Sequence, residues 1–221
     1  ATGGAGPQIL GIDFVGGKTV GAGVAGGTAL VPYVAMAATE IAGLKRAANW
    51  NGVVGPMGTA TALMLMDGTA TTASVTWNSP LTAANPGIWQ NAYLDAPGDV
   101  RMMNGYLDPT AVASPATVTV TGLPASFGTA GYDVYVYTTG DIPIAATRIY
   151  KYAIGTAAVM VTQTGPNPAA FPGYVVAPAA GANTVLFRNI TGPSFTLTAT
   201  PANSAQRAPV NGLQIVSPTG M

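Results

Sequence analysis

The chain has 221 residues, of which only 8 are Lys or Arg and 8 are Asp or Glu, so its formal net charge is zero. Charged residues make up 7% of the sequence, whereas an average soluble domain carries about 25%. This balance excludes a basic surface for nucleic acid or anionic lipid. The absence of Cys excludes disulfides and thiolate sites, and the absence of His removes the commonest general base and metal ligand.

The N-terminal part of the sequence is rich in glycine. The chain opens with Ala1 and not with an initiator Met, which predicts a secreted, extracellular or cell-surface protein whose leader has been removed. We predict an N-terminal arm over residues 1–8 and a single domain over 9–221, with a glycine-rich insertion at 16–35. The charge-free run between Lys18 and Glu40 contains too many Gly and Pro residues for a membrane span.

Alternation of apolar and polar residues with a period of two is the dominant pattern in the rest of the chain. It predicts strands, in chain order, at residues 9–15, 62–66, 73–77, 117–121, 132–137, 148–154, 184–188, 194–200 and 211–216. Only residues 39–48 have apolar positions at helical spacing, and Gly43 weakens that pattern. Short strands between Gly and Pro turns predict an all-β fold, an antiparallel β-sandwich with at most one short helix.

Several short motifs between Ile9 and Val216 carry a family resemblance. They are IDFVGG at 12–17, MAATEIAG at 36–43, ANWN at 48–51, VTW at 75–77, RMMNGYLD at 101–108, YDVYVY at 132–137, SFTLTATP at 194–201 and APVNGLQIV at 208–216. In this order they resemble a poorly characterised β-rich module of large secreted and cell-surface proteins in bacteria such as Verrucomicrobia and Planctomycetes. The resemblance implies an extracellular jelly-roll-like sandwich, sometimes beside carbohydrate-active domains, and supplies no catalytic residues. The chain departs from this pattern in its glycine-rich insertion and its low charge.

Aspartates in and near turns are the candidate metal and catalytic residues. Asp95, Asp99 and Asp108 lie close in sequence, and converging carboxylates are the oxygen ligands that Ca²⁺ requires. The alternative is that each aspartate caps its own turn, with Asp99 paired to Arg101. Glycoside hydrolysis would instead need two acids about 5 to 9 Å apart, and a deep cleft lined by two of these aspartates or Asp141 would support it.

Tyrosines on two neighbouring strands are the best binding signal in the sequence. If Val134 and Val136 face the core, then Tyr135 and Tyr137 face outward, and the next strand repeats the pattern with Tyr150 and Tyr152. A row of tyrosines stacks on sugar rings or on a partner subunit, so this face is a candidate glycan or subunit contact. The alternative is packing in the core or under loops. The core is also where we expect the three tryptophans, Trp50, Trp77 and Trp89.

The surface of such a chain is difficult to hydrate. The mean hydropathy is +0.36, and a monomer of this size exposes roughly 9,000 Å², so that each charge would have to keep about 600 Å² wet. Either copies of the chain bury this surface or something else covers it. Glycans on the Asn189-Ile190-Thr191 sequon or on the abundant threonines are one such cover.

These observations predict a self-assembling extracellular structural protein, such as a filament or surface-lattice subunit, that is not an enzyme and has no cofactor beyond a possible Ca²⁺. Strand edges or arms would join copies through main-chain hydrogen bonds and apolar burial. The predicted assembly arm consists of Ile9, Leu10, Ile12, Phe14, Val20, Val24, Leu30 and Val31. The alternative prediction is a carbohydrate-binding module of a secreted bacterial protein, with polysaccharide as its partner.

Overall fold

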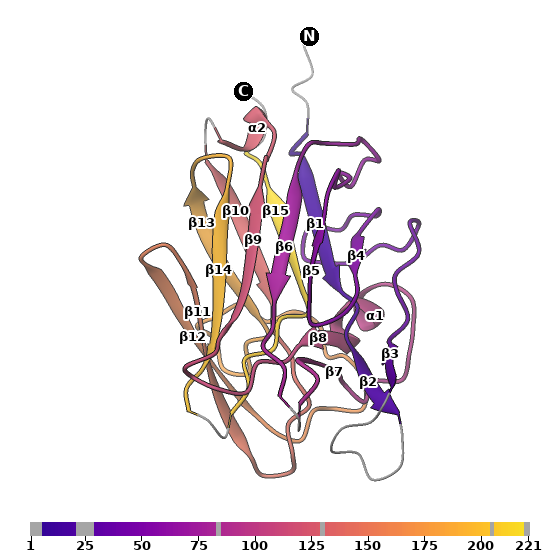
Figure 1. Cartoon of the computed structure of the whole chain (residues 1–221), viewed down its shortest axis with the longest axis vertical. Coiled ribbons are helices and arrows are strands. Elements are labelled where there is room, and N and C mark those ends of the chain that lie inside the picture. Colours follow the sequence, from indigo (N-terminus) through magenta and orange to yellow (C-terminus); the bar gives the residue numbers. More distant parts are fainter. Residues whose placement is uncertain (1–5, 21–28, 83–84, 129–130, 204–205, 219–221) are drawn as a thin grey trace.

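A computed structural model describes residues 6–20, 29–82, 85–128, 131–203 and 206–218 (Figure 1). Two β-sheets pack face to face, one with the strand order β13-β10-β15-β1-β4 and the other with the order β12-β11-β14-β9-β6-β5. Two short hairpins, β2-β3 and β7-β8, complete the described strands. The bounds are β1 (Ile9–Phe14), β2 (Gly17–Val20), β3 (Ala29–Pro32), β4 (Asn51–Val53), β5 (Met57–Ala60), β6 (Ser74–Asn78), β7 (Ile88–Gln90), β8 (Gly105–Leu107), β9 (Ala116–Thr121), β10 (Tyr132–Tyr137), β11 (Thr147–Ile154), β12 (Ala157–Thr164), β13 (Thr184–Ile190), β14 (Phe195–Pro201) and β15 (Gly212–Val216).

The connectivity of the main strands is that of a jelly roll. Strand β1 and strands β9 to β15 are eight strands in chain order, and they form a β1-β15-β10-β13 sheet against a β9-β14-β11-β12 sheet. Strand β4 extends the first sheet, in a parallel pairing with β1, and β6 and β5 extend the second. The remaining pairs in both sheets are antiparallel, so the predicted antiparallel, jelly-roll-like sandwich is confirmed.

Helical structure is limited to two short segments in the described residues, α1 (Asp99–Asn104) and α2 (Ala125–Gly128). The helix predicted at residues 39–48 is wrong. Ala42 and Ala47 exchange backbone hydrogen bonds of 3.2 and 3.3 Å, and Gly43 between them has a φ of 87°, which breaks a helix. Across the described ranges, no helix is long and apolar enough to cross a membrane.

The core lies between the two sheets. From β1 it receives Leu10, Ile12 and Phe14, all with at most 1% of their surface exposed. Alternate residues of β9 and β14 face them, as the sequence alternation predicts. Trp77 belongs to this core, where its ring meets that of Phe14 edge to face at 6.5 Å.

The outer face of the five-stranded sheet is also buried. A second cluster forms there around Tyr135, Tyr137 and Trp50, and Tyr174 from the loop after β12 packs on Tyr137 at 5.0 Å between ring centroids. The hydroxyl of Tyr137 accepts a hydrogen bond of 2.8 Å from the backbone N–H of Leu44. The other sheet therefore covers the inner face of this sheet and long loops cover its outer face, so nearly every residue of its central strands is buried.

The outer face of the six-stranded sheet is open and carries rows of hydroxyl groups. Register aligns Thr59, Thr76, Thr119 and Thr196 across β5, β6, β9 and β14. The hydroxyls bond in pairs, with 3.0 Å between Thr59 and Thr76 and 2.9 Å between Thr119 and Thr196. We call this surface the threonine face, and none of its four strands contains a charged residue.

Candidate functional site

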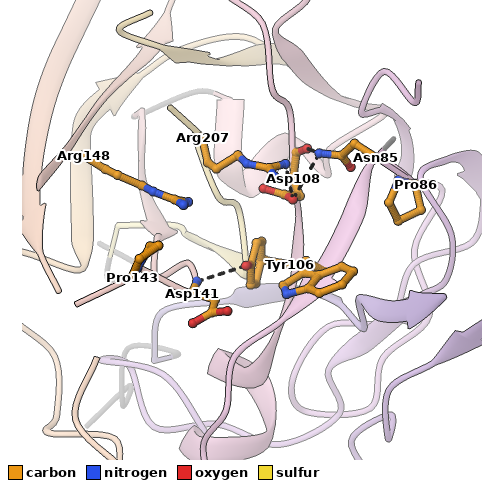
Figure 2. Close-up of a pocket in the computed structure, with 9 residues that line it drawn as sticks. Asn85, Pro86, Tyr106, Asp108, Asp141, Pro143, Arg148 and Arg207 are labelled. Carbon is orange, nitrogen blue, oxygen red and sulfur yellow. Dashed lines mark hydrogen bonds and ion pairs between the residues drawn. The ribbon is translucent and has the colours of Figure 1, made fainter. Parts of the chain in front are cut away.

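A cavity of about 230 Å³ opens at the end of the sandwich where β10 leads into β11. Strands β7 and β8, which contribute Trp89 and Tyr106 to its lining, lie away from the α2 end of the molecule (Figure 1). Figure 2 shows its lining, which we call the end pocket: Asn85, Pro86, Trp89, Tyr106, Asp108, Asp141, Pro143, Arg148 and Arg207.

The β7-β8 hairpin builds one wall of the end pocket. Its register sets Trp89 opposite Tyr106, and backbone hydrogen bonds of 2.9 and 3.2 Å between Leu107 and Val210 tie the hairpin to the segment before β15. Gly105 allows the same hairpin to pack closely on the backbone that follows β1, since a Cβ atom there would lie 1.9 Å from the carbonyl oxygen of Val15. The wall is therefore fixed by backbone contacts and does not depend on flexible side chains.

Asp108 is the central polar group of the end pocket. Its Oδ2 atom accepts hydrogen bonds from Arg207 at 2.7 Å and from Asn85 at 3.3 Å, although only 4% of the side chain is exposed. Its Oδ1 atom is buried and has no hydrogen-bond partner among the described residues. Burial raises the pKa of Asp108 from 3.8 to about 6, although the charge of Arg207 opposes the rise.

Arg148 and Asp141 contribute one positive and one negative charge to the lining of the end pocket. Arg148 comes from β11, and its guanidinium points toward the middle of the end pocket (Figure 2). That guanidinium makes no hydrogen bond or ion pair with any described residue, whereas Arg46, Arg101, Arg188 and Arg207 all form ion pairs. Asp141 is exposed on the other side of the cavity, where its backbone N–H donates to the hydroxyl of Tyr106 at 3.0 Å.

Burial raises the pKa of the Tyr106 hydroxyl well above its ordinary value of 10, and the charge of Asp108 adds to the rise. The group therefore stays protonated and neutral at physiological pH. The end pocket thus combines an aromatic wall, a neutral hydroxyl, a guanidinium that is unpaired among the described residues and the largely buried carboxylate of Asp108. This set both donates and accepts hydrogen bonds, as recognition of a polar, uncharged ligand requires.

Comparison with known proteins leaves this chain without an assigned family. No family model matches it, and no curated protein sequence matches it. Among solved structures, it is similar to the protein YxiM of Bacillus subtilis, with a TM-score of 0.41 and 13% identity over 96% of this chain and 40% of that chain. It is also similar to an exo-β-1,3-galactanase from Phanerochaete chrysosporium, with a TM-score of 0.30 and 15% identity over 51% of this chain and 23% of that one. The chain spans less than half the length of either protein, and likenesses at these scores carry no argument about function.

The structure does not bring together the three aspartates predicted to bind calcium. Asp95 pairs with Arg101 at 2.8 Å, and Arg101 also pairs with Glu40. Asp99 pairs with Arg46 and accepts a hydrogen bond from the hydroxyl of Tyr174, and Asp108 lies apart in the end pocket. Throughout the described part of the chain, no three acidic side chains form a metal-binding group. The suggested Asp99–Arg101 pair is also wrong, because Arg101 takes other partners.

The predicted tyrosine face is wrong because all four side chains are buried. Tyr135 and Tyr137 do point away from the inter-sheet core, but loops cover them, and they are 7% and 0% exposed. Tyr150 and Tyr152 point into the core and are fully buried. Asn189 is exposed near the end of β13, and its glycosylation stays a prediction.

The residues of the predicted assembly arm lie in two places. Those of β1 sit inside the five-stranded sheet, paired on one side with β15 and on the other with β4. Val20, Leu30 and Val31 belong to the β2-β3 hairpin, and Val24 lies outside the described residues. In this fold β1 is a central strand, so it is not a free arm.

Proposed function

We propose that this chain is a carbohydrate-binding module of a secreted bacterial protein and that the end pocket holds one sugar residue. The observation that carries this proposal is that Asp108, one of whose carboxylate oxygens has no hydrogen-bond partner among the described residues, lines the same cavity as Arg148, whose guanidinium is unpaired among those residues. Sugar hydroxyls donate and accept hydrogen bonds at once, and charged partners bind them most strongly. The half-buried ring of Trp89 lines the same cavity and suits the apolar face of a sugar ring.

We propose binding without catalysis. The end pocket is lined by Asp108 and Asp141, which is the arrangement that a hydrolase with paired acids would need. Asp108 is already held by Arg207 at 2.7 Å and by Asn85 at 3.3 Å, however, and both contacts favour its ionised form, whereas a general acid must carry a proton. Asp141 is exposed and lies on the other side of the cavity from Asp108.

Binding to a panel of neutral and uronic-acid-containing oligosaccharides tests this proposal, with isothermal titration calorimetry on the strongest ligand. Arg148→Ala should weaken binding roughly 10-fold or more, the usual effect of losing hydrogen bonds to a charged group. Arg188→Ala is the matched control, because this exposed arginine pairs with Asp133 away from the end pocket. Equal binding by both variants, or no binding to any glycan, would refute the proposal. Release of shortened sugars would show hydrolysis instead.

We propose self-assembly at the cell surface as a second function. The observation in its favour is that half of the chain's 8 basic residues, Arg46, Arg101, Arg188 and Arg207, are neutralised in ion pairs. Little free charge remains to keep copies of the protein apart, and the threonine face has none on its four strands. Light scattering of the purified protein over a wide concentration range tests this function, and a constant monomer mass would refute it.

A further inference from the structure

Strand β12 forms one open edge of the six-stranded sheet. It is 8 residues long, pairs with β11 alone among the described strands, and lies along the outer margin of the molecule (Figure 1). Its sequence, AAVMVTQT, contains no charged residue and no proline. The pairing with β11 is continuous from Ile154–Ala157 to Thr147–Thr164, without a bulge. Natural sheet edges normally carry one of these protective features, because an open edge pairs with other chains.

The other edges of the two sheets are protected. Strand β5, at the far side of the same sheet, has only 4 residues and follows Pro56. Strand β4 has 3 residues. Strand β13 carries Arg188, its pairing with β10 is irregular, and Val176 bridges to Thr184. Of these four edge strands, β12 is therefore the one without a protective feature.

The β11-β12 hairpin determines which backbone groups of β12 face outward. Its turn has two residues, so Ile154 and Ala157 form a hydrogen-bonded pair, and every second residue after Ala157 bonds to β11. The residues between them direct their N–H and C=O groups away from the sheet. These are Ala158, Met160, Thr162 and Thr164, whose side chains are all exposed.

We infer that β12 is the contact through which a second copy of this chain binds, by antiparallel pairing of two β12 strands about a twofold axis. This inference rests on the second proposed function, self-assembly, and names its interface. We assign a second copy as the partner because a twofold contact brings β12 against the same strand of the other copy. Strand β12 carries no charged residue, so the two identical strands would not repel each other. Two identical strands use all four outward-facing residues only when the axis passes beside Val161.

This register fixes the cross-strand neighbours. Ala158 pairs with Thr164 of the second copy, and Met160 pairs with Thr162 of the second copy. The two six-stranded sheets then continue into one sheet, and the two threonine faces lie on the same side of it. Gln163 stays in place, because its side chain donates to the carbonyl oxygens of Thr138 and Ala182 at 2.6 and 2.8 Å within its own subunit.

Sedimentation velocity on the full chain, from micromolar to millimolar concentration, tests the inference with paired charge variants. The double variant Met160→Lys with Thr162→Lys sets like charges opposite each other in this register and should leave only the 22.0 kDa monomer. Met160→Lys with Thr162→Glu sets opposite charges there and should restore association. Met57→Lys is the matched control, since Met57 on β5 is 52% exposed and Met160 is 53% exposed. It should associate like the wild type.

Backbone amide exchange provides a readout that follows the register directly. The N–H groups of Ala158, Met160 and Thr162 should gain protection as concentration rises, whereas that of Val161 is protected at every concentration. Circular dichroism confirms that each variant is folded. A wild-type protein that stays monomeric would overturn both this inference and self-assembly. Association that survives the double-lysine variant, or that Met57→Lys abolishes, would overturn the β12 contact and leave self-assembly standing.

Discussion

The buried carboxyl group of Asp108 should make the protein less stable as pH rises through the weakly acidic range. Its pKa is about 6 in the folded protein, against 3.8 for an ordinary aspartate. Folded molecules therefore keep this proton to a higher pH than unfolded ones. By linkage, the free energy of unfolding falls as pH rises from about 4 to about 6 and no longer depends on this group above that range.

The magnitude follows from the difference between the two pKa values. A rise from 3.8 to about 6 corresponds to roughly 3 kcal/mol lost between the two protonation states. Arg207 reduces this loss through its 2.7 Å ion pair, but 32% of the Arg207 side chain is exposed and solvent screens the attraction. Desolvation of Asp108 therefore outweighs the ion pair, and ionised Asp108 destabilises the fold.

Urea denaturation of the wild type and of Asp108→Asn, repeated between pH 4 and pH 8, measures this effect. The stability of the variant relative to the wild type should increase by about 2 kcal/mol from pH 4 to pH 7, because part of the total change of about 3 kcal/mol falls below pH 4, and then stay nearly constant. Packing differences appear as a constant offset at every pH. The buried Asp13 titrates in both proteins and cancels in the comparison.

Two results would refute this reasoning. A difference between the two proteins that does not change with pH would mean that Asp108 has an ordinary pKa in the folded protein. A variant that becomes relatively less stable from pH 4 to pH 7 would mean that the ion pair with Arg207 outweighs the cost of burial. In that case Asp108 would be a stabilising residue.

Three further substitutions test other parts of the fold by urea denaturation at neutral pH. Asp13→Asn should raise the free energy of unfolding, because burial raises the pKa of Asp13 and its ionised form is unfavourable inside the protein; an unchanged or lower value would contradict this. Gly105→Ala should lower the free energy of unfolding by more than about 3 kcal/mol and weaken ligand binding, since the new Cβ atom collides with backbone. A variant as stable as the wild type would show that the β7-β8 hairpin can shift to make room. Tyr137→Phe should lower the free energy of unfolding by about 1 to 3 kcal/mol, because it leaves the partly buried N–H of Leu44 without its hydrogen bond to the hydroxyl. Tyr135→Phe, which removes no hydrogen bond found among the described residues, should change it little.

Alternation in the sequence predicted strands well and the environment of their faces poorly. The prediction for residues 117–121 matches β9, because one face of that strand lies in the core and the other lies in solvent. The prediction for 132–137 gave the bounds of β10, yet it placed Tyr135 and Tyr137 in solvent. Loops distant in sequence cover that face, and no local pattern reports on them.

Some elements escaped prediction because their sequences lack a local signal. Strand β12 contains only two valines, and alanine and methionine occupy solvent positions, so its alternation is hidden. The expected strand at residues 62–66 contributes only isolated bridges at Met64 and Leu65. The backbone N–H groups of this segment instead donate hydrogen bonds to the carbonyl oxygens of Thr69 and Ala73 across turns. The segment therefore does not pair along its length with a neighbouring strand.

The end pocket was only partly predictable. Asp108 and Asp141 were recognised as candidate acids, but the partner of Asp108 is Arg207, which lies 99 residues away in sequence. Trp89 was expected in the core and instead lines the pocket. A signal was nevertheless present, because in a chain with 8 basic residues every arginine without an obvious partner is a candidate for function.

The hydroxyl rows on the outer sheet change how this protein should respond to its medium. Molecules with charged surfaces repel one another, and this repulsion weakens as ionic strength rises because salt screens it. The four strands of the threonine face hold water through groups that neither titrate in the physiological range nor attract counterions. Hydration of that face should therefore change little with pH or with salt concentration.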